Sequence, residues 1–341
     1  MAITLAGTAA LSLVRRCRTL IFMSFRDSGT SRWRARAFAF GSGKRPIGDP
    51  PPYNSGVQPA PEVGRAWRRA LGFRMNHEAE RQSTETPAEI YERHMVPAML
   101  ASWVPALLDL LALKPGERVL DVACGTGVVA RQAASLVGTG GHVVGLDFNG
   151  DMLARARAQG PAMEWREGNA MDLPFATHTF DVVVCQQGLQ FFPDSGTALR
   201  EAHRVLVPGG RFAVAVWCAI ESSQGHHALT RGLERHVGTE AAGLMSAVFR
   251  LGDAQALQTL LEIAGFRDVR VRREKRVARF PSPELFVRWV VVGSVLGRTG
   301  VQVRDESLAA LIREVDRALQ PYMRSDGLAF PMEAHLAVAR T

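Results

Sequence analysis

Apolar positions fall into two alternating patterns from residue 87 onward. Residues 87–113 repeat apolar side chains as an amphipathic helix does, and the Pro115–Gly116 pair ends that segment. Short runs that are apolar at nearly every position then predict strands at 118–123, 142–147, 163–166, 180–185 and 211–217. Between them the pattern predicts helices at about 126–136, 150–158 and 194–206, with 207–211 as a turn. This alternation predicts an α/β fold with a largely parallel sheet covered on both faces.

Two segments exceed this minimal sheet. Residues 218–250 and 281–325 flank a strand expected around 269–277, and a last alternating strand is expected at 332–340. The 283–297 stretch is apolar on nearly every face, and a helix of that kind is buried or covers an apolar ligand or partner. We expect a lid over a lipophilic substrate, with core packing and a homodimer interface as alternatives.

The first 74 residues have a different composition. They hold 13 of the 41 Lys and Arg residues but three of the 33 acidic ones, so residues 75–341 carry a net charge of −2. The segment lacks a pattern able to bury a core, which predicts a disordered basic leader or a non-native extension, with a mitochondrial targeting segment as the alternative. We expect the folded domain to span 75–341. Its near-neutral charge and lack of an interleaved basic–aromatic patch argue against a nucleic-acid partner.

Cysteines and apolar runs bear on location. The four cysteines are too widely spaced for a zinc site, so the sequence predicts no metal and reduced thiols in the cytoplasm. Uninterrupted apolar runs stay well short of the roughly 18–20 residues that span a bilayer, which predicts no stable membrane insertion.

In a parallel sheet, ligands bind at the carboxyl ends of the strands. The first strand is followed there by the turn Gly125–Gly127, the second by Asp147, the third by "GNAMDLPF" (168–175) and the fourth by "CQQGLQFFPD" (185–194). Gly125, Gly127 and Ala130 have the dinucleotide-binding spacing, and Asp147 lies 20 residues after Gly127. Taken alone, this spacing suits an NAD-dependent oxidoreductase.

Together with "RVLVPGGR" (204–211), this ordered set resembles the class I S-adenosylmethionine (SAM)-dependent methyltransferases over about residues 117–217. Within them it is similar to the subgroup of ubiquinone and menaquinone C-methyltransferases. The resemblance implies a Rossmann-like seven-stranded sheet with helical inserts after strands five and six. It also implies SAM as cofactor and methyl transfer to a small apolar acceptor. The chain departs from the family pattern at Ala123, where a glycine is usual, at Asn169, where aspartate is common, and at "QQGLQFF", which leaves the acceptor chemistry open.

The resemblance implies which residues contact each chemical group of the cofactor. Small turn residues let the backbone approach its methionine portion, and Asp121 organises the turn and receives the ammonium group. Asp147 accepts both ribose hydroxyls, with a helix cap as the alternative. Phe148 offers an apolar face for adenine, and Asn169 accepts from its exocyclic amine. The full expected cofactor set is Asp121, Ala123, Cys124, Gly125, Thr126, Gly127, Asp147, Phe148, Met152, Asn169, Ala170, Met171 and Gln186. Met152 and Met171 could equally fill the core.

For the acceptor we expect contacts from Gln187, Gln190 and Trp289. The candidates for a general base also include His94, His226 and His227, but none is assigned, and the His226–His227 pair is expected on the surface. A SAM-binding regulatory protein without catalysis and an NAD-dependent oxidoreductase stay open as alternatives.

Overall fold

The structure is a computed structural model that describes residues 85–341 except 161 and 294–302. The leader 1–74, the start expected at residue 75 and the last four residues of the apolar 283–297 stretch lie outside the described residues.

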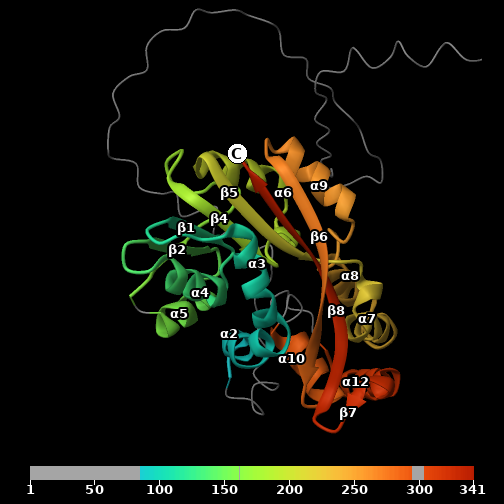
Figure 1. The fold of residues 1–341 in the computed structure, drawn as a ribbon. Helices are drawn as coiled ribbons and strands as arrows, with labels where there is room; N and C mark the ends of the chain where they lie inside the picture. The colour runs from blue at the N-terminus through green and yellow to red at the C-terminus, as the bar shows by residue number, and fades with distance from the viewer. Residues whose placement is uncertain (1–84, 161, 294–302) are drawn as a thin grey trace, which may run out of the picture. The chain divides into compact units, whose positions relative to one another are not determined.

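The strands assemble into one sheet in the order β3-β2-β1-β4-β5-β8-β6 (Figure 1). Their bounds are Arg118–Val122 (β1), His142–Asp147 (β2), Glu164–Glu167 (β3), Phe180–Gln186 (β4), Leu206–Trp217 (β5), Arg267–Phe280 (β6), Met323–Arg324 (β7) and Gly327–Arg340 (β8). The first five strands pair in parallel, while β8 runs antiparallel between β5 and β6. The two-residue β7 adds a short pairing with β8. The expected seven-stranded α/β sheet is therefore confirmed, with β7 as an addition.

Helices cover both faces of the sheet. One face carries α3 (Val104–Leu111), α4 (Val128–Val137) and α5 (Gly150–Gln159), and the other carries α6 (Ser195–Val205) and α9 (Ala254–Ile263). Successive strand residues point to opposite faces: Val182 and Val184 join the first core, whereas Val183 and Cys185 join the second. Burial on both faces explains why the strands are continuous apolar runs.

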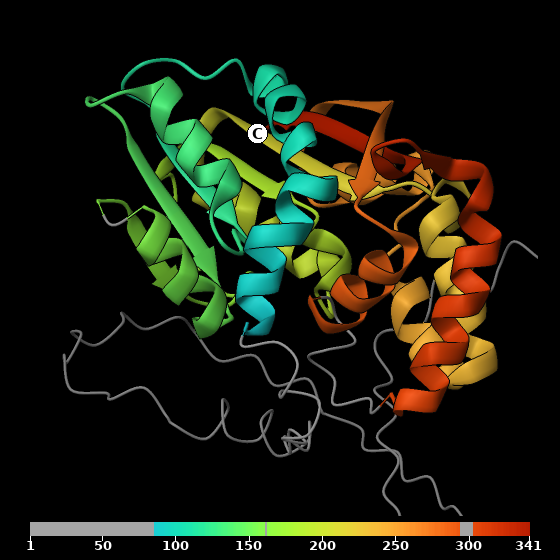
Figure 2. The same ribbon diagram turned by 90° about the horizontal axis from the view of Figure 1, so that it is seen from below.

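The expected single helix over 87–113 is divided. It consists of α2 (Pro87–Ile90), the π-helix η2 (Tyr91–Leu100), the 3₁₀-helix η3 (Ala101–Trp103) and α3, which follow one another along the first face (Figure 2). Pro97 lies inside η2, where it cannot donate a backbone hydrogen bond to the preceding turn. The stretch Pro87–Leu111 is long and apolar enough to cross a membrane by length and composition, and half of it is buried inside the fold. Packing against the sheet therefore accounts for its apolar character.

The turn expected at 207–211 lies within β5. Leu206 pairs with Phe180, but the next pairing joins Arg211 to Val182, so five steps along β5 match two along β4. The extra residues form a bulge, and Gly209 takes the positive φ of 76° there.

Helical inserts follow β5 and β6, as expected. The first contains α7 (Gln224–His236) and α8 (Thr239–Ala247), and the second contains α10 (Pro283–Gly293) and α12 (Asp305–Leu319). Short 3₁₀ turns, η4 (Leu189–Phe191), η5 (Ile220–Ser222) and η6 (Gln320–Tyr322), complete the described elements. α12 lies beside α7, and α10 contacts both α2 and η2 (Figure 2). The inserts thus extend the core of the first face beyond the sheet.

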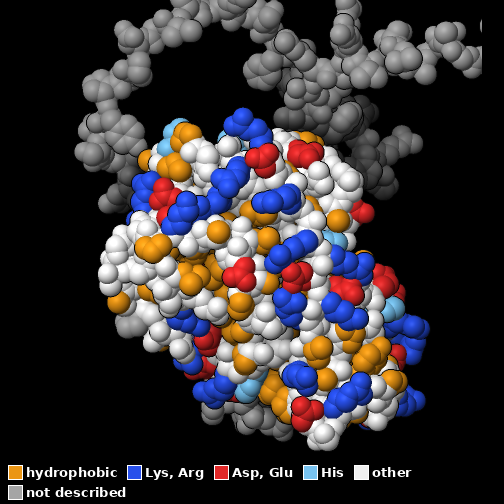
Figure 3. All heavy atoms as spheres, in the orientation of Figure 1, with side chains coloured by type: hydrophobic (Ala, Val, Ile, Leu, Met, Phe, Trp, Pro, Cys, Tyr) orange, Lys and Arg blue, Asp and Glu red, His pale blue; other side chains and the backbone are white. Residues whose placement is uncertain are grey.

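Charged side chains of both signs are interspersed over the face seen in Figure 3. On the edge strand β6, Arg272 and Arg276 both pair with Glu274, at 2.9 and 2.6 Å. This distribution fits the near-neutral balance of the residues after position 74.

The indole of Trp165 fills space that two glycines leave open. A Cβ atom at Gly127 would lie 2.2 Å from the ring, and one at Gly145 would lie 2.4 Å from it. Gly127 also has a φ of 88° immediately before α4, a backbone conformation that favours glycine. Both the backbone and the neighbouring ring therefore require a glycine at position 127.

We expect Gly127→Ala to lower the free energy of unfolding by roughly 2–4 kcal/mol, because the strained backbone and the overlap with Trp165 both contribute. Gly209→Ala is the matched control, since its φ is 76° and no atom lies within 4 Å of the added Cβ. It should cost only about 1 kcal/mol. Equal losses for the two variants in chemical denaturation would show that Trp165 does not constrain the turn.

Candidate functional site

The turns after β1 and β4 meet at one edge of the sheet. These neighbouring strands lead to connections on opposite sides, which makes this the switch point where ligands bind in open α/β sheets. A Cβ atom at Gly188 would lie 2.6 Å from the Cβ of Ala123, so the two turns are in direct contact. Ala123 and Gln187 have φ values of 58° and 54°, although neither is a glycine. Strained non-glycine residues cluster at functional sites.

The carboxylate of Asp147 joins the turns after β1 and β2. Its Oδ2 accepts from the Gly125 amide at 2.8 Å, and its Oδ1 accepts from the Asn149 amide at 2.9 Å. An ionised carboxylate can accept about four hydrogen bonds, and hydroxyl groups are among the donors that it can bind. The alternative of a helix cap is wrong, because Asn149 is the N-cap of α5 and accepts from the amides of Asp151 and Met152.

Asp121, in β1, links the same turn to the start of α4. Its Oδ2 accepts from the Ala130 amide in the first turn of α4, at 3.0 Å, and its side chain is buried. Burial is the main cause that raises the pKa of Asp121 to about 8, and the negative charge of Asp147 contributes to this rise. A cationic group brought close to this carboxyl would favour its ionised form.

The N-terminal helix covers the turn after β1. The ring of Tyr91 in η2 faces Gly125, whose added Cβ would lie 3.7 Å from it. Arg131 of α4 pairs with Glu92 of η2 at 2.9 Å and also donates to the backbone oxygen of Thr126. The position of η2 is thereby tied to the turn.

Four of the unpartnered buried polar atoms lie at this edge, and others are scattered through the fold. Within the described part of the chain, no hydrogen-bond partner reaches the buried atoms Thr126 Oγ1, Gln186 Oε1, Gln187 Nε2 and Gln190 Oε1. The other end of the Gln186 amide donates to the Leu100 oxygen at 3.1 Å. Because buried polar atoms in folded proteins are almost always paired, such a concentration indicates a place where a ligand supplies the partners.

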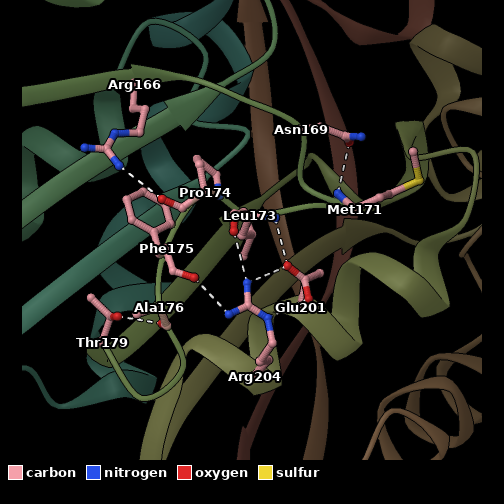
Figure 4. A network of polar contacts seen from close by, with 10 residues as sticks. All are labelled: Arg166, Asn169, Met171, Leu173, Pro174, Phe175, Ala176, Thr179, Glu201 and Arg204. Carbon is pink, nitrogen blue, oxygen red and sulfur yellow. Dashed lines mark hydrogen bonds and ion pairs between the residues drawn. The ribbon is translucent and has the colours of Figure 1, made fainter. Parts of the chain in front are cut away.

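The loop after β3 is held by an ion pair on α6 (Figure 4). Arg204 donates to the backbone oxygens of Leu173 and Phe175 at 3.0 and 2.8 Å, and it pairs with Glu201 at 2.7 Å. Glu201 in turn accepts from the Leu173 amide at 2.8 Å. Within the same loop, the Oδ1 of the exposed Asn169 already accepts from the Met171 amide at 3.0 Å.

Sequence reasoning missed Arg204, Glu201, Tyr91 and the Arg131–Glu92 pair as residues that hold the site. The motifs "NAMDLPF" and "RVLVPGGR" were visible, but the contact between them spans about 30 residues and has no local pattern.

Other expected cofactor residues differ in exposure. Cys124, Met152 and Ala170 are buried, whereas Phe148 is 70% exposed. Burial raises the pKa of the Cys124 thiol, so this group is neutral.

The expected acceptor residues divide into two places. Gln187 and Gln190 lie together in the loop after β4, but Trp289 lies on α10 and is half-buried. Its ring stacks on His94 with the centroids 4.0 Å apart, and the Nε2 atom of His94 lies 3.2 Å from Glu85.

The expectation that His226 lies on the surface is wrong. His226 is buried among Phe249, Phe286 and Phe330, and its Nδ1 lies 2.9 Å from the hydroxyl oxygen of Ser223. Burial lowers the pKa of His226 to about 4, so the ring is neutral near pH 7. His227 is only partly buried. In the described ranges, no group of three or more His, Cys, Asp or Glu residues is placed to hold a metal ion.

The family model that matches this chain covers the stretch from β1 to β5. The family described as "Methyltransferase domain" matches residues 120–214. The chain is 44% identical over 115 residues to the 2-phytyl-1,4-naphtoquinone methyltransferase of Thermosynechococcus vestitus, covering 33% of this chain and 51% of that protein. It is 32% identical over 196 residues to the demethylmenaquinone methyltransferase of Staphylococcus carnosus, covering 53% of this chain and 78% of that protein.

The chain spans about half the length of the first of these curated relatives. A solved structure of Haemonchus contortus phosphoethanolamine N-methyltransferase 2, in complex with S-adenosyl-L-methionine, is 20% identical with a TM-score of 0.48. That match covers 79% of this chain and 60% of the other.

The titration of Asp121 predicts a pH dependence of folding. Its pKa is raised from 3.8 to about 8 in the folded state, so its contribution to stability is fully present below about pH 4 and is lost as the pH rises through 8. Relative to Asp121→Asn, which does not titrate, the free energy of unfolding of the wild type should fall between pH 5 and 8, by at most about 1.4 kcal/mol per pH unit. Chemical denaturation of both proteins across this range measures the difference, and parallel curves would contradict the expectation.

Proposed function

Because the chain belongs to the class I SAM-dependent methyltransferases of the quinone-methylating type, we propose that it transfers a methyl group from SAM to an apolar, quinone-derived ring. The acceptor class is that of the naphthoquinone and menaquinone methyltransferases to which the chain is similar. The observation in this chain that carries the proposal is the set of unpartnered polar atoms at the carboxyl ends of β1 and β4, beside an apolar core. We take residues 75–341 as the catalytic domain and the cytoplasm as its location.

The residues at this edge fit the chemical groups of SAM. Asp147 is placed to accept hydrogen bonds from ribose hydroxyls, and Asp121 offers a carboxyl to the ammonium group. The exposed ring of Phe148 offers a face to adenine, and the Oδ1 of Asn169 has a second lone pair for the exocyclic amine. Thr126 and Gln186 contribute unpartnered oxygens. The remaining members of the expected set shape the turn and the adenine pocket.

When bound, SAM supplies a methyl group on a positively charged sulfur. A nucleophilic ring carbon of the acceptor forms a bond to this methyl carbon while the carbon–sulfur bond breaks and its electron pair stays on sulfur. The ring then loses a proton to solvent. Such an in-line displacement depends mainly on positioning and on exclusion of water, and the turns at this edge provide the first of these.

The buried histidine of the first insert is poorly suited to take that proton. With a pKa of about 4, the ring of His226 is a weak base near neutral pH. We therefore assign the chain a binding and orienting role and propose no general base. Gln187, Gln190 and Trp289 are the proposed acceptor contacts, with α10 as a cover over the ring.

Turnover of labelled SAM tests the proposal. The full chain should convert SAM to S-adenosylhomocysteine in step with methylation of a 1,4-naphthohydroquinone that carries an isoprenoid chain, kept reduced under anaerobic conditions. Binding of SAM without turnover on this and related rings would favour a regulatory SAM-binding protein. Binding of NAD in place of SAM would favour the oxidoreductase.

We expect Asp147→Ala to weaken SAM binding by on the order of 10²-fold, because the ribose hydroxyls lose two hydrogen bonds to a charged group. The loss in binding free energy should be smaller than the sum of two such bonds, because water still contacts the hydroxyls. Asp147→Asn should lose less, since one oxygen still accepts. Asp151→Ala is the matched control, because this aspartate is exposed in the first turn of α5. Calorimetric titration measures all three variants. Wild-type affinity in Asp147→Ala would refute the placement of the ribose.

A further inference from the structure

Two buried glutamines in the loop after β4 are bonded to each other. Gln190 Nε2 donates to Gln187 Oε1 at 3.1 Å, and the two residues are 3% and 8% exposed. Among the described residues, nothing pairs with Gln187 Nε2 or with Gln190 Oε1. Rotating both amides by 180° would reverse the bond but would still leave one donor and one acceptor unpaired. The pair therefore presents one donor and one acceptor under either assignment.

The loop that carries the pair is fixed from two sides. Arg250, at the end of the first insert, donates to the backbone oxygens of Gln190 and Phe192 at 2.6 Å each and to the Ser195 hydroxyl at 2.9 Å. On the sheet side, the Gln187 amide donates to the Ala215 oxygen at 2.8 Å. The backbone that carries the two side chains is thus held before a ligand arrives, and the side-chain amides hold each other, which reduces the entropy that binding must overcome.

The pair also adjoins the proposed cofactor turn. Gly188, between the two glutamines, contacts Ala123, and a side chain at position 188 would overlap Ala123 and Cys185. A ring bound by the two amides would therefore lie next to the turn that is proposed to hold the methyl donor.

We propose that Gln187 and Gln190 together bind a hydroxyl group on the ring of the methyl acceptor. A hydroxyl oxygen can accept from one amide while its hydrogen is donated to the other, so a single group satisfies both unpaired atoms. A ketone or ether oxygen only accepts, and it would leave an acceptor buried and unpaired, which is costly. This inference rests on the proposed function and adds to it the two residues that would distinguish a ring bearing a hydroxyl group from one whose oxygens only accept.

The preference agrees with the chemistry of carbon methylation. The ring carbon must donate an electron pair to the methyl group, and hydroxyl groups on the ring raise its electron density, whereas the carbonyls of a quinone withdraw it. Selection by the amide pair would bring the nucleophilic form of the ring to the methyl donor.

The test compares the binding of 1-naphthol with that of 1-methoxynaphthalene, whose oxygen accepts but does not donate. The full chain should bind 1-naphthol about tenfold more tightly than the ether, as measured by equilibrium dialysis. The Gln187→Leu/Gln190→Leu variant serves as the reference, because it corrects for differences in size and solubility between the two probes. In that variant the preference should collapse. Gln258→Leu, on α9, should keep the wild-type preference, because its amide is bonded to Glu262 away from the loop.

An unchanged preference in the double variant would overturn the proposal and assign the pair to the fold or to a bound water. If the double variant fails to fold, side-chain amide resonances of ¹⁵N-glutamine in the wild type give the answer. Two of them should shift with 1-naphthol and much less with the ether, and equal shifts would overturn the proposal. Binding of these probes needs no methyl transfer, so failure here and failure of the turnover assay are distinguishable.

Discussion

The candidate site depends on the hydrogen bonds that the carboxylate of Asp147 accepts. This carboxylate accepts from the amides of Gly125 and Asn149, and so fixes the turn after β1 relative to the loop after β2. Asp121 holds the same turn to the first residues of α4. Burial, with the nearby charge of Asp147 adding to it, raises the pKa of Asp121. A positively charged ligand would favour the ionised form of Asp121, so the same two acids shape the turn and favour a cation.

Much of the fold could be predicted because strands that are buried on both faces appear in the sequence as continuous apolar runs. β2 has the expected bounds, and β1 and β4 differ from expectation by one residue. The division of the helix over 87–111 and the bulge in β5 were not predicted, because each depends on pairing or packing with distant segments. His226 illustrates the same limit: a polar residue gives no local sign that three phenylalanines from other elements surround it.

The site was predicted unevenly for a related reason. The residues that we propose as ligand contacts lie at strand ends and carry motifs, so Asp121, Asp147 and the glutamines after β4 could be named. Residues that hold those loops lie on helices, and the sequence does not link them to the loops. Arg204 is of this kind, since its contacts with Leu173 and Phe175 give the loop after β3 its shape without any motif that joins them. Trp165 is another such residue. The glycine motif after β1 is usually explained by the ligand, but Gly127 is also required because the Trp165 indole leaves no room for a side chain there.

Arg250 joins the first insert to the loop after β4 through three hydrogen bonds. The parallel strands and the turns after β1 and β2 take no part in these bonds. The inserts lie outside the minimal sheet, where changes of length are tolerated more easily than within it. A change in the helices that present this one guanidinium could therefore reshape the loop after β4 while the turns after β1 and β2 stay unchanged.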